Sequence, residues 1–167
     1  AWADRPPQPM AEVAPYHVKY AGVAHDEKRA EIGKALEEDG IDAAVLTSPT
    51  SLAWAFNIRG GDVMCTPLPL GRAILHKDGT ADLFLDEAKV SPKLRKHLGN
   101  TVTVRPLSEI DEGLGELAGK TVSLDPDLAS AWFFDTVEAA GGKIVRQRDP
   151  VALPRACKNE AEIKGTT

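Results

Sequence analysis

The stretch RAILHKDGTADLFL, residues 72–85, decides the fold of this sequence. Two short, mainly apolar runs at 72–76 and 81–85 flank the turn at 77–80. Asp-Gly between two such runs is a strong signal for a β-hairpin, which joins antiparallel strands. The other predicted strands alternate with helices, and this alternation is typical of a layered α/β domain. The hairpin therefore predicts a mixed sheet rather than an all-parallel one.

The segments on either side of the hairpin supply the remaining helices and strands. Helices are predicted at 26–38, 52–56, 87–98, 107–117 and 128–140, and further strands at 43–46, 101–105, 121–124 and 143–147. Asp26 is the expected cap of the first helix, and Pro92 is expected to interrupt the 87–98 helix. The run 43–46 is wholly apolar, which indicates a buried strand. We therefore expect a layered α/β domain with a mixed sheet of five to six strands flanked by helices.

The two ends of the chain differ from its centre. Residues 1–23 hold four prolines and three large aromatic side chains, so we expect an extended lead-in that packs along the domain. Residues 24–153 are expected to form the α/β domain, ending in a loop at 149–154. Residues 154–167 are interpreted as a hinge followed by a helix that starts at Asn159. The chain begins without methionine, which suggests a piece of a longer protein.

The composition is that of an ordinary globular protein, with 43% hydrophobic and 27% charged residues and a net charge of −5. This acidic balance argues against a nucleic-acid partner, because such binders need a basic face. No apolar run approaches the roughly 20 residues that span a bilayer, so no membrane partner is expected. For Cys65 and Cys157 we expect two reduced thiols, as in a cytoplasmic protein, rather than a disulfide.

The sequence contains no recognisable catalytic or metal-binding motif. Its four histidines stand singly, and it has no Cys-x-x-Cys, no Gly-x-Ser-x-Gly and no glycine-rich phosphate loop. One stretch is unusual, because Asn57, Arg59 and Asp62 surround two glycines directly after a short helix. An arginine is a planar fork suited to carboxylates and carbonyls. Two interpretations stay open: Arg59 and Asp62 bridge each other and fix the loop, or one of them faces an active site built elsewhere.

The segment SLAWAFNIRGGDV, residues 51–63, resembles the IAWLFNIRGSDV segment of cytosolic-type aminopeptidase P, within the creatinase/prolidase-like metallopeptidases. Three further motifs resemble that family in the same order along the chain: W-x-DRP-x-x-P at 2–9, AG-x-x-x-x-EK at 21–28, and the hinge P-x-KA-x-KN-x-x-E-I at 154–163. Met64 and Cys65 depart from the residues that are usual in the family after "DV".

The resemblance implies that this chain is the middle, non-catalytic domain of a three-domain Xaa-Pro aminopeptidase. Its parent would remove the N-terminal residue from Xaa-Pro peptides with two divalent metals, usually manganese, held in the third domain. This chain would then be inactive alone and bind no cofactor. Its partners would be the first and catalytic domains, the peptide substrate, and a second copy of the parent in a homodimer. Asn57, Arg59 and Asp62 would be candidates for the substrate entrance or for the contact between domains.

Two alternatives stay open beside this interpretation. The chain is a stand-alone binding or assembly module of the same fold, or the equivalent domain of a prolidase or creatinase relative. The residues at 165–167, Gly-Thr-Thr, lie too soon after the hinge to be the family's ligand-bearing Gly-Thr-Thr-Asp segment. Similarity of fold does not choose among these functions, whereas the sequence that follows Thr167 would.

Overall fold

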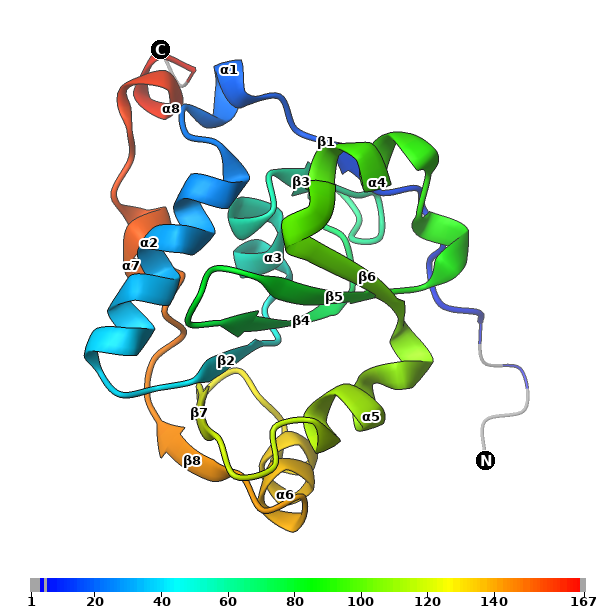
Figure 1. The fold of residues 1–167 in the computed structure, drawn as a ribbon. Coiled ribbons are helices and arrows are strands. Elements are labelled where there is room, and N and C mark those ends of the chain that lie inside the picture. Colours follow the sequence, from blue (N-terminus) through cyan, green and yellow to red (C-terminus); the bar gives the residue numbers. More distant parts are fainter. Residues whose placement is uncertain (1–3, 5, 166–167) are drawn as a thin grey trace.

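A computed structural model describes residues 4 and 6–165, and its centre is a six-stranded mixed sheet (Figure 1). The strand order is β6-β5-β4-β2-β7-β8. Their bounds are β2 Ala43–Leu46, β4 Arg72–His76, β5 Ala81–Leu85, β6 Val102–Pro106, β7 Thr121–Leu124 and β8 Lys143–Arg146. The hairpin strands β4 and β5 are antiparallel, and β4 is also antiparallel to β2, whereas β2, β7 and β8 are parallel. The predicted mixed α/β sheet is confirmed.

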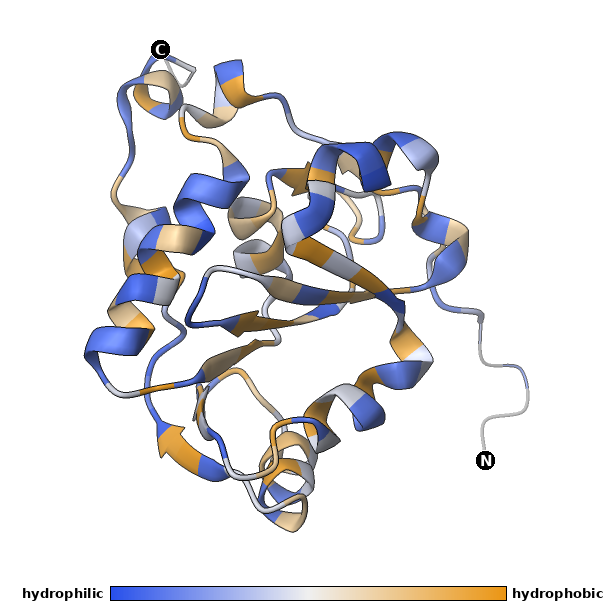
Figure 2. Ribbon diagram, in the orientation of Figure 1, coloured by the Kyte–Doolittle hydropathy of each residue, from blue (hydrophilic) through white to orange (hydrophobic). Residues whose placement is uncertain are grey.

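Helices cover both faces of this sheet and enclose two hydrophobic cores. On one face lie α2 (His25–Glu38), α3 (Pro49–Ala55) and α4 (Pro92–Leu98), and on the other lie α5 (Ile110–Gly115) and α6 (Ala131–Ala139). Ala44 and Leu46 of β2 belong to the first core, and Ala43 and Val45 belong to the second. Figure 2 shows hydrophobic residues concentrated in the central strands and hydrophilic residues on the outer surfaces of α2 and α4.

The prolines set the starts of two helices. Pro49 lies in the first turn of α3, which begins at residue 49 rather than at the expected residue 52. Pro92 divides the predicted 87–98 helix into a 3-10 helix, Glu87–Lys89, and α4, whose cap is Ser91. A proline is tolerated there because the first helical N–H groups have no partner within the helix. The prediction for Asp26 was wrong: α2 has Ala24 at its cap, and Asp26 lies in the first turn, where the helix dipole favours a negative charge.

The ends of the described chain contain elements that were not predicted. Within the lead-in, β1 (Ala14–Pro15) pairs with β3 (Ile58–Arg59), and α1 (Val18–Ala21) forms one helical turn. In the expected 149–154 loop, α7 (Ala152–Ala156) begins. Asn159 caps α8 (Glu160–Lys164), the helix that was expected to start there. The W-x-DRP motif and the final Gly-Thr-Thr lie partly outside the described residues.

The remaining differences concern the lengths of the helices and strands. A 3-10 helix at Gly99–Thr101 precedes β6, and another at Leu107–Glu109 precedes α5. Consequently β6 lies one residue later than expected, and the regular α-helix of α5 is shorter than the expected 107–117. Helix α6 starts at residue 131 rather than 128, and β8 ends at 146 rather than 147. None of these shifts changes the order of the strands.

Helix α5 offers a matched test of packing, because two of its glycines differ in their surroundings. A Cβ added at Gly113 would lie 2.4 Å from Cζ of the buried Phe84, whereas one at Gly115 meets no atom within 4 Å. We expect Gly113→Ala to lower the free energy of unfolding by about 1–3 kcal/mol through overpacking. Gly115→Ala should leave it unchanged or raise it by up to about 1 kcal/mol, because alanine is the better helix former. Urea denaturation measures both, and equal effects would refute the close contact.

Candidate functional site

Asn57 lies at the turn between α3 and β3, where its side chain is used inside the protein. It adopts a left-handed conformation with φ 48° and is 2% exposed. The side-chain nitrogen donates to the carbonyl of Val23 at 2.9 Å, and the side-chain oxygen accepts from Lys28 Nζ at 2.8 Å. Its backbone carbonyl accepts from the N–H of Tyr16 at 2.7 Å. Asparagine tolerates this left-handed conformation better than most residues. Through these hydrogen bonds, Asn57 joins α2, the lead-in and β3 at one point.

Asp62 forms a buried ion pair with Lys89. The carboxylate accepts from Lys89 Nζ at 2.8 Å, and the two side chains are 0% and 4% exposed. The same carboxylate accepts from the backbone N–H groups of Leu70 at 2.7 Å and Ala11 at 3.3 Å. These contacts satisfy the acceptors of the aspartate and tie the irregular loop after β3 to the lead-in and to the segment after β5. Asp62 therefore fixes the loop.

Arg59 lies half-buried on β3, and its guanidinium group is not paired with Asp62. Nη1 donates to the backbone carbonyls of Ala53 at 3.1 Å and Ile58 at 2.8 Å, and the guanidinium carbon lies 3.8 Å from the ring centre of Tyr16. Burial lowers the pKa of Arg59. The interpretation that Arg59 and Asp62 bridge each other was wrong, because each residue fixes the loop through partners of its own.

A cavity of about 430 Å³ opens beside Arg59, between α1, β3 and α8. Its walls include Tyr16, Tyr20, Arg59, Lys158 and Glu162. Apart from Arg59 of β3, these side chains come from the two ends of the chain, whose helices α1 and α8 lie side by side in Figure 1. Cationic, acidic and aromatic groups thus share one opening.

Asn159 holds α8 against α1. Its side-chain nitrogen donates to the carbonyl of Ala21 at 2.8 Å, while its side-chain oxygen caps α8. A Cβ at Gly22 would lie 2.2 Å from that oxygen, and Gly22 has φ 77°. Both facts require glycine at this position. The sequence pairs Ala21-Gly22 and Lys158-Asn159 therefore meet in space, although 138 residues separate the bonded pair.

Lys28 is a buried cation next to this opening. Its Nζ lies 4.1 Å from the ring centre of Trp54 and donates to the carbonyl of that residue at 3.3 Å, in addition to its bond with Asn57. Burial lowers the pKa of Lys28 to about 8. The motif residues Lys28, Asn57, Arg59 and Asn159 thus all lie at the same end of the domain.

The sequence suggested four isolated histidines, but two of them lie together in the structure. The rings of His25 and His97 lie 4.6 Å apart, and His25 Nε2 bonds to the carbonyl of His97 at 2.8 Å. Burial lowers the pKa of His25. No sequence signal links two residues 72 positions apart. Among residues 4 and 6–165, no group of three or more His, Cys, Asp or Glu side chains is arranged to hold a metal ion.

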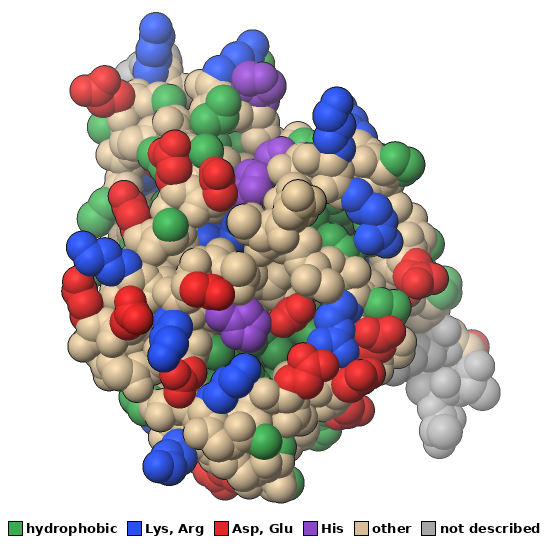
Figure 3. All heavy atoms as spheres, viewed as in Figure 1, with side chains coloured by type: hydrophobic (Ala, Val, Ile, Leu, Met, Phe, Trp, Pro, Cys, Tyr) green, Lys and Arg blue, Asp and Glu red, His purple; other side chains and the backbone are tan. Residues whose placement is uncertain are grey.

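The surface outside these clusters is mixed in charge. Figure 3 shows Lys and Arg side chains interspersed with Asp and Glu side chains over the visible face. No helix in the described part of the chain is long and apolar enough to cross a membrane. Cys65 and Cys157 are both free and exposed.

The profile of the creatinase/prolidase N-terminal domain matches residues 4–162. The chain belongs to this family. Curated relatives of this creatinase/prolidase N-terminal domain include the probable Xaa-Pro aminopeptidases P of Paracoccidioides lutzii and Penicillium rubens, which are 32% and 31% identical to it over 97% of the chain. The chain spans only 28% and 27% of the lengths of these two proteins.

Solved structures share the fold of this creatinase/prolidase N-terminal domain. The X-prolyl aminopeptidase from Caenorhabditis elegans, described as a cytosolic enzyme with a di-nuclear active site, gives a TM-score of 0.86 at 24% identity, over 98% of this chain and 28% of that one. The Xaa-Pro dipeptidase from Bacillus anthracis gives 0.63 at 20% identity, over 84% of this chain and 38% of that one. At these identities the likeness shows the fold alone.

The buried ion pair predicts a large loss of stability when one partner is removed. Asp62→Asn leaves Lys89 buried without its counter-ion, so we expect the free energy of unfolding to fall by about 3–5 kcal/mol. The control is Glu38→Gln, which removes an ion pair with Lys34 whose side chains are 68% and 77% exposed. This change should cost less than about 0.5 kcal/mol. Similar losses in the two variants, measured by urea denaturation, would contradict the role given to Asp62.

The lowered pKa of Lys28 predicts that the stability of the domain depends on pH. Its pKa of about 8 in the folded chain lies below the ordinary 10.5 of an unfolded chain, so the unfolded state binds more protons between these values. Stability from Lys28 therefore rises as the pH increases from about 8 to about 10.5. We expect the free energy of unfolding of the wild type, relative to that of Lys28→Met, to increase over this range. A constant difference would show that Lys28 is not perturbed in the fold.

Proposed function

We propose that this creatinase/prolidase N-terminal domain is the middle domain of a Xaa-Pro aminopeptidase and that it carries none of the catalytic residues. One observation supports the proposal above the others: relatives named Xaa-Pro aminopeptidase P match 97% of the chain, yet the chain spans only 28% of their length. The described residues offer no group that fits a metal ion. The two divalent metals, for which we propose manganese, would therefore be held by another part of the parent.

Within that parent, we propose that the end of the domain around Arg59 packs against the catalytic domain beside the substrate entrance. Residues of three family-like sequence motifs, at 21–28, 51–63 and 154–163, lie at this end. It also carries a cavity lined by Arg59, Tyr20 and Glu162. Tyr20 is an exposed aromatic side chain, and such residues are favoured at contacts between domains. Asn57 and Asp62 would act indirectly, by holding Arg59 in place through their buried hydrogen bonds.

The proposal includes the partners and the location of the parent. These partners are the first domain, the catalytic domain, a peptide with proline at its second position, and a second copy of the parent in a homodimer. The description of the Caenorhabditis elegans relative as cytosolic supports a cytoplasmic location. The alternative is a stand-alone module of the same fold, which requires that the fold can form apart from a catalytic domain. The N-terminal domain of the peptidase PepQ from Mycobacterium tuberculosis has been solved separately, and 95% of that chain matches this fold with a TM-score of 0.56.

Activity measurements separate these functions. We expect the 167-residue chain with Mn²⁺ to show no turnover of an Arg-Pro-Pro peptide, whereas the longer protein that contains it releases arginine. In the longer protein, Arg59→Gln should lower kcat/KM by up to roughly 100-fold, because a displaced wall misplaces the substrate. The matched control Lys34→Gln alters an exposed cation and should have no effect.

Two results would refute parts of the proposal. Turnover by the 167-residue chain would show that it contains a catalytic centre. Full activity of the Arg59→Gln variant, with an unchanged melting temperature, would show that Arg59 has no role at the substrate entrance. A reading frame that starts near Ala1 and stops near Thr167 would favour the stand-alone module.

A further inference from the structure

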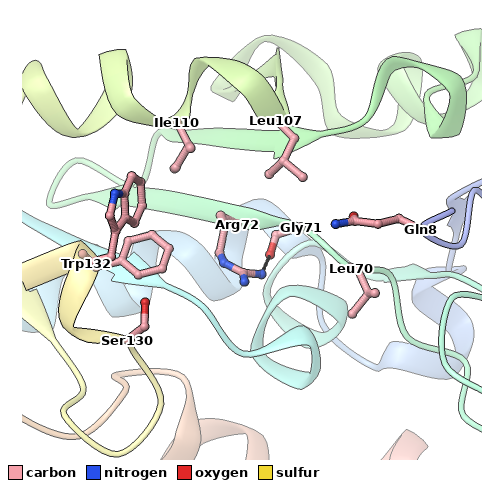
Figure 4. Close-up of a pocket in the computed structure, with 9 residues that line it drawn as sticks. Gln8, Leu70, Gly71, Arg72, Leu107, Ile110, Ser130 and Trp132 are labelled. Atoms are coloured by element: carbon pink, nitrogen blue, oxygen red, sulfur yellow. Dashed lines mark hydrogen bonds between the residues drawn. The ribbon is translucent and has the colours of Figure 1, made fainter. Parts of the chain in front are cut away.

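A second cavity, of about 570 Å³, lies on the opposite face of the sheet from α2, between α5 and the start of α6 (Figure 4). Leu107 and Ile110 line one wall, Trp132 lies on the other, and Arg72 lies between them at the start of β4. Phe133 also lines the cavity. The volume falls within the range of about 300–1,000 Å³ that is usual for small-molecule sites. The walls are mainly apolar, with Gln8 and Ser130 as polar residues, and Arg72 is the charged residue among those that line the cavity.

Arg72 has few partners for a half-buried arginine. A guanidinium group has five N–H donors, and its one hydrogen bond within the described chain runs from Nη1 to the carbonyl of Gly71 at 2.6 Å. No carboxylate of residues 4 and 6–165 forms an ion pair with it. Burial lowers the pKa of Arg72. Donors of the guanidinium group therefore remain available in a partly dehydrated site.

Other buried arginines in this chain are better satisfied. Arg105 pairs with three glutamates at 3.0–3.6 Å. Arg29 bonds to the Gly79 carbonyl, Thr101 and His25. Compared with Arg29 and Arg105, Arg72 has fewer acceptors within the described chain, so its remaining donors can serve an acceptor from outside.

The backbone around Arg72 is fixed by close packing. A Cβ at Gly71 would lie 2.7 Å from Leu85 Cδ2 and 2.8 Å from the carbonyl oxygen of Phe84, so glycine allows this segment to lie directly against β5. The guanidinium carbon lies 5.8 Å from the ring centre of Phe133, and Trp132 packs edge-on against that ring with centres 4.8 Å apart. Trp132 is nevertheless 42% exposed and offers an aromatic surface at the opening.

We propose that this cavity binds a carboxylate carried on an apolar body, such as an aromatic acid or the C-terminal residue of an apolar peptide. The carboxylate accepts hydrogen bonds from the fork of Arg72, whose geometry matches two carboxylate oxygens. The apolar body lies between Trp132 and the side chains of Leu107 and Ile110. This inference rests on the cavity alone and does not depend on the proposed peptidase function.

The binding test uses paired probes on the 167-residue chain. The first pair is 3-phenylpropionate and its neutral amide, and the second is N-acetyl-Leu-Phe with a free carboxylate and the same dipeptide as its amide. We expect the acids to bind at least about tenfold more tightly than the amides, because only they accept charge-assisted bonds from Arg72. If 3-phenylpropionate binds more tightly than N-acetyl-Leu-Phe, the ligand is a small acid. If the dipeptide binds more tightly, the ligand is a peptide C-terminus. NMR titration should shift the indole N–H signal of Trp132.

Two variants locate the carboxylate. Arg72→Gln should weaken binding of the acid at least about tenfold and leave binding of the amide unchanged. The matched control is Arg146→Gln, because Arg146 is an exposed arginine that stacks on Phe134, the neighbour of Phe133, at 4.4 Å. It should bind like the wild type.

The proposal is overturned if the acid and the amide bind equally, if Arg146→Gln loses as much affinity as Arg72→Gln, or if neither acid shifts the signal of Trp132. The chemical-shift changes of the wild type with the acid and with the amide test the proposal even if Arg72→Gln does not fold. In that case the variant Arg72→Lys is used, which keeps the charge without the fork. If this variant no longer binds the acid more tightly than the amide, the result supports the proposal; if the difference in affinity is unchanged, the result opposes it.

Discussion

The burial of β2 on both faces is the constraint on which the rest of the structure depends. A strand in this position cannot expose a polar side chain to water on either side, so all four of its residues, from Ala43 to Leu46, are apolar. It must also have a neighbour along each edge. The hairpin supplies one through β4, and the crossover to β7 supplies the other. The two cores and the helices that close them follow from this placement.

The end of the domain around Arg59 is organised by polar contacts rather than by apolar packing. Lys28, Asn57 and Asn159 each bond to a segment distant in the sequence, with separations of 29, 34 and 138 residues. Each of these residues belongs to a motif that resembles aminopeptidase P. The structure thus gives these motifs a physical reason: glycine and asparagine are required at positions where backbones approach closely or adopt a left-handed conformation.

The sequence predicted the parts of the fold that local patterns determine. The strands at 43–46, 72–76, 81–85 and 121–124 have the expected bounds, because short apolar runs between turn residues mark them clearly. It did not predict the pairing of β1 with β3, since two-residue strands have no period. Nor could it give Lys89 as the partner of Asp62, because a buried ion pair between distant residues leaves no pattern along the chain. The cavity at Arg72 was missed for the same reason, since its walls come from separate elements.

The hydrogen bond between Asn159 and the carbonyl of Ala21 holds the two ends of the described chain together. Neither end belongs to the six-stranded sheet, and α1 and α8 bury few apolar side chains, so their attachment is weaker than that of the strands. A force on the C-terminal end of the described chain would therefore act on this contact and on Gly22 before it acts on the sheet. A displacement of α8 would therefore act first on α1 and on the cavity beside Arg59, which α1 and α8 both line, and not on β2 and its neighbours.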